Sequence, residues 1–390
     1  MSVTEPAPRR RRPWIIALPL ALLVLLGIGW SGLWVYAART ADGEIDAWIA
    51  REKLLGRQWS CSERALEGFP FRFELMCRDP VLVTQGGDSF RISAAAAHAV
   101  AQVWDPSHIV AEFASPARIE DQATGQVYTA SWSLLQMSGV GDSTGRPVRF
   151  DLVVNTPMVE QAPGNASATP LLSAKQIETH ARRRPGENGA RDGIDFALSI
   201  AGGESPQLAS TGSAGPLDLA VQMTVTAVDD LRPMSVTDRL RAWAMSGGMM
   251  QLQGFTLTTP SAAANATGAL LVDGQGRLNG QLVLGFAGIE DTLRNLSKAG
   301  LISPEYVPIV GALAMAGKKG DVAGRKGVTF SIAFDQGALK LGKIPVGIVP
   351  PLFPPPVAPL PAPQSITPQS ITPQAVTPQA PAPATPAPAQ

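Results

Sequence analysis

The chain of 390 residues carries 32 Lys and Arg residues against 32 Asp and Glu residues, so its formal net charge is zero. Such a chain offers no general positive field, which argues against nucleic acid as a partner. Charged residues make up 16 % of the sequence, against about a quarter in ordinary soluble domains. With 38 Gly and 35 Pro residues, the composition favours a sheet protein over a helical bundle.

The N-terminal segment has the pattern of a membrane anchor. Four arginines at 9–12 precede an uncharged, mostly apolar run at 15–38. About twenty apolar residues suffice to cross a hydrocarbon core of about 30 Å. Trp14 at one end and Trp34 with Tyr36 at the other are typical of the aromatic belts at the two membrane surfaces. The arginine block predicts a cytoplasmic N-terminus and a single pass through a bacterial inner membrane.

A cleaved signal peptide is the alternative, because residues 35–37 form a passable small-residue cleavage site. Both interpretations place the rest of the chain outside the cytoplasm. The predicted organisation is a basic cytoplasmic segment at 1–13, a transmembrane anchor at 14–38, a periplasmic β domain at 39–349 and a disordered proline-rich tail at 350–390.

A short helix is expected at 42–55, where Gly56 ends it. After it, the alternation of apolar and polar residues that is typical of strands recurs along the chain, at 69–77, 148–154, 194–200, 217–225, 278–286 and 328–334. Turn-forming clusters at 142–145 and 273–276 separate such runs. One apolar and one polar face, joined by short turns, predict a mainly β (α+β) fold with a long antiparallel sheet that can curl. A few accessory helices are expected, at 237–246, 289–299 and 305–316.

The segment from residue 350 onward changes character, with a five-residue repeat that starts at Gln364 and then Ala-Pro repeats to the end. Such a segment cannot bury enough apolar surface to fold, and its prolines favour extended polyproline II. It could serve as a spacer or as a ligand for an envelope protein, and the alternative is a solvated tail without a role.

Two cysteines, Cys61 and Cys77, lie sixteen residues apart around one strand-like run. Beyond an export signal, such a pair predicts a disulfide. The alternative is that both are unrelated buried thiols that pack as small apolar side chains.

No catalytic signature is found in the sequence. Residues 141–145 match Gly-x-Ser-x-Gly, but a nucleophile elbow needs a helix after the serine, and a strand-like run follows here. A hairpin turn is therefore expected. His98, His108 and His180 lack the spacing of metal ligands. We expect a protein that is not an enzyme and uses no cofactor and no metal.

Several motifs resemble a bacterial family known as domain of unknown function 2125, found mainly in alphaproteobacteria. The motifs are Asp46, Trp48 and Glu52 in an Asp-x-Trp-x-x-x-Glu helix, the block 59–77 around Gly-Phe-Pro-Phe-Arg, and the segments 265–280 and 339–350. The resemblance covers residues 10–352. This family has no established activity, so it implies no catalytic residue. The Gly-Phe-Pro-Phe-Arg motif behind an anchor also looks loosely like AsmA-type envelope proteins, which are associated with phospholipid handling.

The sequence favours a non-enzymatic envelope protein that binds membrane lipids or another amphiphile, because long alternating strands with few charges follow a predicted anchor. A curled sheet can shelter acyl chains on its apolar face, although the same faces could pack a closed core. The alternative is a scaffold or assembly factor that holds envelope proteins through its sheet surface and tail, and a hydrolase using Ser143 is the least favoured hypothesis. The residues singled out are Cys61 and Cys77 with Gly68, Phe69, Pro70, Phe71 and Arg72 between them, which would equally fit a core strand with a solvent-facing arginine.

Overall fold

The computed structural model describes residues 14–85, 89–161, 168–186, 191–206, 215–228, 235–288, 317–342 and 344–354, with a few single residues between 294 and 303. These residues belong to the first of two units of the chain, 1–355 and 356–390. Apart from those single residues and the start of the tail, the helices predicted at 289–299 and 305–316 and the proline-rich tail lie outside the described residues.

One long helix opens the described chain. Helix α1 (Trp14–Leu54) has 41 residues, which at 1.5 Å per residue is about 60 Å, twice the thickness of a hydrocarbon core. The sequence predicted an anchor and a separate helix at 42–55. Residues 42–54 are helical as predicted, but they continue the anchor helix without a break, because no proline interrupts residues 35–54 and the helix accommodates Gly43. The helix ends at Gly56 as predicted, where the backbone φ is +77°.

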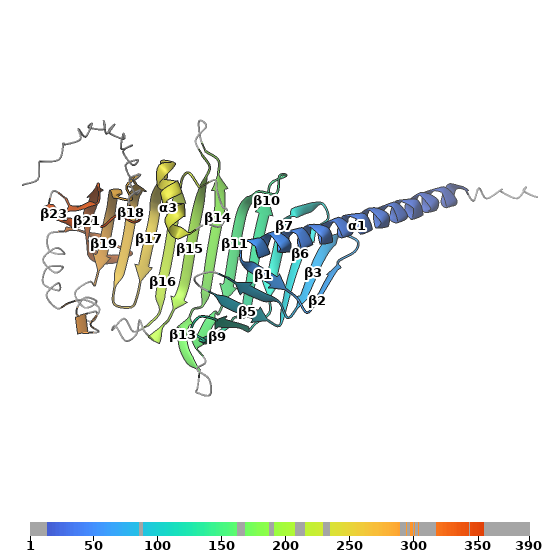
Figure 1. Ribbon diagram of the computed structural model, residues 1–390, viewed down its shortest axis with the longest axis horizontal. Coiled ribbons are helices and arrows are strands. Elements are labelled where there is room, and N and C mark those ends of the chain that lie inside the picture. The colour runs from blue at the N-terminus through green and yellow to red at the C-terminus, as the bar shows by residue number, and fades with distance from the viewer. Residues whose placement is uncertain are drawn as a thin grey trace, which may run out of the picture. The chain divides into compact units, whose positions relative to one another are not determined.

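The strands that follow form two antiparallel sheets (Figure 1). The small sheet comprises, in spatial order, β1 (Arg57–Ser60), β4 (Val81–Thr84), β5 (Phe90–Ala94), β8 (Ala117–Asp121), β9 (Val127–Ser131), β12 (Met158–Gln161) and β13 (Thr169–Ser173). The large sheet comprises β2 (Glu63–Glu67), β3 (Arg72–Arg78), β6 (Ala96–Gln102), β7 (Asp105–Phe113), β10 (Leu134–Gly141), β11 (Pro147–Asn155), β14 (Gln176–Arg184), β15 (Gly193–Gly203), β16 (Leu217–Val225), β17 (Met249–Thr258), β18 (Ala263–Val272), β19 (Leu278–Ala287), β21 (Arg325–Asp335), β22 (Ala338–Leu341) and β23 (Ile344–Ile348). Strand β20 (Lys318–Val322) pairs with β21 beside this path.

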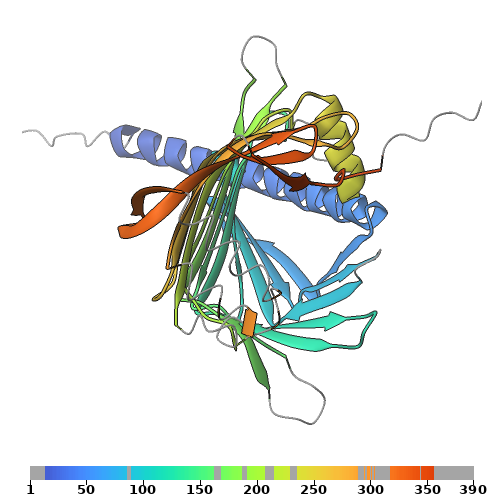
Figure 2. The same cartoon turned by 90° about the vertical axis from the view of Figure 1, so that its left-hand side faces the viewer.

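The first half of the chain passes repeatedly from one sheet to the other at a row of corners. Backbone hydrogen bonds continue through them: Asp79 N donates to Ala95 O at 3.0 Å, and Thr156 N donates to Lys175 O at 2.8 Å. Asp79 and Thr156 have φ of 44° and 46°, which turns the chain sharply. The residues buried at the corners are small or cyclic, namely Pro80, Ala117, Pro157 and Ala174. Figure 2 shows the small sheet bending away from the large one.

From β14 onward, the described strands belong to the large sheet alone. The predicted runs at 148–154, 194–200, 217–225, 278–286 and 328–334 all lie within strands of this sheet, which confirms them. The predicted turns at 142–145 and 273–276 join β10 to β11 and β18 to β19. The expected antiparallel, mainly β fold is therefore confirmed, and the described sheets do not close.

The register of the large sheet aligns apolar residues across its strands. A single row of paired residues, called the apolar row below, runs from β3 to β23. Its members are Phe73, Ala101, Ile109, Gly139, Phe150, Ala181, Phe196, Met223, Leu252, Gly268, Leu282, Ile332, Leu341 and Ile344. At about 4.8 Å between neighbouring strands, the row is about 60 Å long.

The other face of the large sheet is more polar. In the strands β11, β14 and β15, the residues next to the apolar row are Asp151, His180 and Ala197, which are themselves paired across the strands. In these strands the large sheet therefore has one apolar and one polar face, as the period-two sequences predict.

No member of the apolar row is buried. Most are half-buried by their neighbours in the sheet, while Ile109 and Phe150 are 48 % and 37 % exposed. A face covered by a second layer would instead bury such residues almost completely. Burial is local: at one margin of the sheet, helix α3 (Val236–Met245), predicted at 237–246, contributes Ala244 to a cluster with Val272 and Phe353.

The end of α1 is joined to β1 by an ion pair, which gives stability a pH dependence. Glu52 accepts hydrogen bonds from Arg57 at 2.5 and 2.7 Å. The hydrogen bond from Arg57 lowers the pKa of Glu52 below its usual 4.5, although partial burial acts in the opposite direction. A lowered folded-state pKa means that the pair stabilises above about pH 4.5 and that this contribution is lost as the pH falls through the folded pKa.

We predict that Glu52→Gln lowers the unfolding free energy by about 1 kcal/mol at pH 7 and by progressively less below pH 4.5. Thermal melts of the full chain in detergent between pH 7 and pH 3 would measure this difference. Glu44→Gln, an exposed carboxylate of the same helix, is the control. A Glu52→Gln deficit that stays constant with pH would contradict the prediction.

Candidate functional site

The singled-out motif Gly68–Arg72 forms the turn between β2 and β3. The sequence predicted a strand from Phe69, and this is wrong, because β3 begins at Arg72. Gly68 has φ of +102°, and a Cβ atom there would lie 2.7 Å from the carbonyl oxygen of Arg72. Only glycine fits this position, and Pro70 has no N–H for a sheet ladder. The rings of Phe69 and Phe71 are consequently 54 % and 60 % exposed instead of packed in a core.

Two tryptophans of α1 hold this turn. The indole Nε1 of Trp30 donates to the carbonyl oxygen of Pro70 at 3.0 Å. The Nε1 of Trp34 donates to the carbonyl oxygen of Arg72 at 3.2 Å. These bonds fix the turn at a defined level along the helix.

Ring contacts connect the turn to the apolar row. Trp34 packs edge-on against Phe69, with ring centroids 5.5 Å apart, and stacks on Phe73 at 6.1 Å. Phe73 is the first member of the apolar row. On the other side of the turn, Phe71 lies 6.4 Å from Trp104, in the turn between β6 and β7. The row therefore begins in direct contact with the apolar helix.

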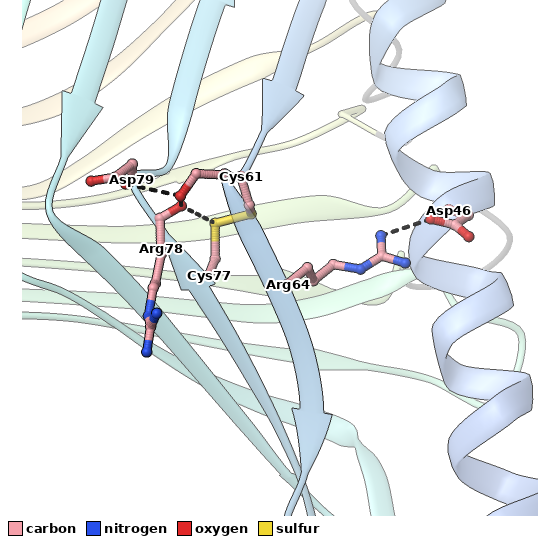
Figure 3. The surroundings of a disulfide bond; sticks show 7 residues. Asp46, Cys61, Arg64, Cys77, Arg78 and Asp79 are labelled. Atoms are coloured by element: carbon pink, nitrogen blue, oxygen red, sulfur yellow. Dashed lines mark hydrogen bonds and ion pairs between the residues drawn. A yellow bond between two sulfur atoms is a disulfide. The ribbon is translucent and has the colours of Figure 1, made fainter.

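The predicted disulfide is present. Cys61 and Cys77 are bonded, with their Cα atoms 5.5 Å apart, so the link between β1 and β2 is tied to β3 (Figure 3). In the same view, Arg64 of β2 reaches α1. Its guanidinium donates to Asp46 at 2.7 Å and to Asp42 at 2.8 Å. These ion pairs fix the first edge of the large sheet to the helix, and the disulfide ties that edge to the chain that enters from β1.

Helix α1 also contacts the small sheet. The rings of Trp48 and Trp59 lie 5.8 Å apart. Trp59 is paired with Leu82, which is paired with Ile92, so this side of the small sheet is apolar as well. Since Phe73 and Trp59 both face α1, the helix lies on the apolar side of both sheets (Figure 1).

The polar face of the large sheet carries a network of ion pairs. Asp151 binds His180 at 2.8 Å and Arg149 at 2.6 Å, and Asp195 binds Arg182 at 2.8 Å. The hydrogen bond from Arg182 lowers the pKa of Asp195, against the opposite effect of partial burial. These residues line a shallow pocket of about 430 Å³. Their charges are satisfied within the sheet, as in a structural ion-pair ladder.

The remaining predicted residues do not form a reactive site. His98 pairs with Glu74 at 2.6 Å, and His108 with Ser138 at 3.0 Å. Among the residues that the structure describes, no group of His, Cys, Asp and Glu could hold a metal ion. Ser143 lies in the tight turn between β10 and β11, where Asp142 N donates to Arg146 O at 2.9 Å. The expected hairpin turn at 141–145 is therefore confirmed.

Sequence reasoning missed the two features that define the candidate site. The apolar row depends on which strands pair and in which register, and the Trp30 and Trp34 contacts join segments about forty residues apart. The only available signal was the clustering of aromatic residues in the anchor and in the Gly-Phe-Pro-Phe-Arg motif.

A protein-family model described as an uncharacterised protein conserved in bacteria, DUF2125, matches residues 34–350. The chain therefore belongs to this family, as its motifs predicted. No curated protein and no solved structure matches the chain. The looser likeness to AsmA-type envelope proteins has no support from these comparisons.

The disulfide gives a direct test of how the sheet edge is held. Closing a loop of this length stabilises by about 3 kcal/mol in the chain-entropy model. We predict that the double variant Cys61→Ala and Cys77→Ala lowers the unfolding free energy of the full chain by about this amount, measured by denaturant titration in detergent.

Reduction of the unaltered protein is the control and should give the same loss, whereas a reductant should leave the double variant unaffected. Equal stability of the variant and the oxidised protein would contradict the prediction.

Proposed function

We propose that this chain is a single-pass, membrane-anchored envelope protein that is not an enzyme and holds lipid acyl chains on the apolar face of its large sheet. The observation that carries the proposal is the apolar row, which crosses the sheet from β3 to β23 without one buried member. Apolar surface of this extent normally marks a binding site in a soluble domain.

Acyl chains suit this face for a physical reason. The row offers aliphatic and aromatic side chains such as Phe196, Met223 and Leu252, with small residues such as Gly139 and Gly268 between them. The side chains of such a surface offer no directional hydrogen bonds. The surface therefore recognises the length of a ligand's hydrocarbon chain more than the identity of its polar group. Each CH₂ group that leaves water on such a face contributes up to about 0.8 kcal/mol.

The anchor gives this face a supply of lipid. Residues 17–54 form a helix long and apolar enough to cross a membrane, and the apolar side chains of its span are not buried in the protein. The arginines at 9–12 favour a cytoplasmic N-terminus, which puts the sheets in the periplasm. The disulfide supports an oxidising compartment.

The hypothesis of a hydrolase that uses Ser143 gains no support, because Ser143 lies in a polar hairpin turn between two strands and a nucleophile elbow joins a strand to a helix. The scaffold hypothesis rests largely on the proline-rich tail, most of which lies outside the described residues. It stays a prediction of the sequence.

Photocrosslinking in the full chain tests the proposal with neighbouring residues on opposite faces. We predict that p-benzoylphenylalanine at Phe196, in the apolar row, crosslinks to phospholipid in bacterial membranes. The same group at Ala197, which faces the polar side between His180 and Gln222, should not. Mass spectrometry of the crosslinked peptides identifies the lipid.

Both positions are half-buried and adjacent on β15. A difference in lipid crosslinking between them therefore shows which face of the sheet binds lipid, and does not reflect how exposed each position is. Equal lipid crosslinking at both positions, or none at Phe196 while the protein is folded, would contradict a lipid-holding role.

A further inference from the structure

The hairpin turns at one end of the large sheet differ in character with their distance from α1. In strand order from the helix, the first three of these turns join β2 to β3, β6 to β7, and β10 to β11. The first two expose aromatic rings: Phe69 is 54 %, Phe71 60 % and Trp104 67 % exposed. The third turn is polar, and Asp142 accepts hydrogen bonds there from the backbone and hydroxyl of Thr144. Of these three turns, the two nearest the helix carry the exposed aromatic rings.

The depth of these turns in the membrane follows from the spacing of two tryptophans along α1. Trp14 and Trp34 are separated by twenty residues, which at 1.5 Å per residue is about 30 Å, the thickness of a hydrocarbon core. If Trp14 lies at one membrane surface, Trp34 lies at the other. Because Trp34 contacts Phe69 and holds the carbonyl of Arg72, the β2–β3 turn lies at this second surface.

Trp104 is brought to the same surface through the sheet. Its ring lies 6.4 Å from that of Phe71, and Val103 N donates to Phe71 O at 3.1 Å. Exposed aromatic rings of this kind are unfavourable in water and prefer the interfacial layer of a bilayer, where the ring is shielded and its polar atoms stay hydrated.

We propose that the β2–β3 and β6–β7 turns insert into the interfacial layer of the membrane that α1 spans, and form the mouth through which acyl chains reach the apolar row. The occupant of this aromatic surface is the leaflet on the side of the sheets. The inference rests on the proposed lipid-holding function and adds where the lipid enters and from which leaflet it comes.

The continuity of the apolar contacts supports this path. Phe73 stacks on Trp34 and begins the row. The next members are Ala101 on β6 and Ile109 on β7, and Ile109 is 48 % exposed. An acyl chain that leaves the leaflet beside Trp34 therefore meets apolar surface at each step and does not cross water.

Depth measurements on labelled full-length protein test the insertion. Single cysteines replace Phe71 or Trp104, with Thr144→Cys in the polar turn as the matched control, and carry a nitrobenzoxadiazole label. The native cysteines are bonded to one another and do not react without a reductant. In vesicles of phosphatidylcholine and phosphatidylglycerol, doxyl lipids should quench positions 71 and 104 at least about threefold more than position 144.

The entry role has its own measurement. A photoactivatable phosphatidylcholine is supplied to preformed proteoliposomes, and its crosslinking to the β15 peptide that contains Phe196 is followed over time. We expect the double variant Phe71→Ser and Trp104→Ser to slow this appearance at least about threefold, with the final yield unchanged. Both side chains are mostly exposed, so the variant should fold, and a thermal melt checks this.

The possible failures are distinguishable. If the labels at 71 and 104 remain in water like the label at 144 while lipid still reaches Phe196, the proposal that these turns form the lipid entry is wrong. The proposed lipid-holding function would stand. Inserted labels with an unchanged rate of crosslinking would also overturn the proposed lipid entry. Absence of lipid at Phe196 in the unaltered protein would overturn the proposed function and the mouth together.

Discussion

The pairing register of the large sheet is the constraint on which the other properties depend. Because side chains alternate between the two faces, a slip of one residue in any pair would move an apolar row member such as Phe196 to the polar side. On that side it would meet groups such as Asp151 and His180, which are hydrogen-bonded to each other across the strands in the observed register. The polar face therefore helps to specify the register, and the register produces the continuous apolar face.

The anchoring of the first strands gives this face its position. The turn at Pro70 and Arg72 is bonded to Trp30 and Trp34, and β2 is held to the helix through Arg64. Each contact contributes little to stability by itself, since a typical hydrogen bond contributes about 1 kcal/mol to the free energy of folding. Together with the disulfide they act on one edge of one sheet. The strands that follow extend the apolar face away from the helix. The contacts of α1 with β2 and β3 therefore set the orientation of the whole large sheet relative to the helix.

The sequence predicted the local features well and the long-range ones poorly. Period-two patterns located strands such as β15 and β16, and Gly-containing clusters located the turns. The strand predicted from Phe69 failed because Gly68 and Pro70 favour a turn over the alternating pattern. The corners between the sheets, the apolar row and the contact of Trp34 with Phe73 depend on tertiary pairing, for which a single sequence holds no direct signal. The cysteine pair was predictable only through the anchor, which indicated an oxidising compartment.

Native mass spectrometry of the full chain, purified in a mild detergent and followed by lipid extraction, shows whether the large sheet holds acyl chains. We expect phospholipid to remain bound, and we expect Met223→Lys in the apolar row to remove it while Gln222→Lys on the opposite face does not. A bare protein mass from folded, unaltered protein, with no lipid in the extract, would contradict the claim that the large sheet holds acyl chains.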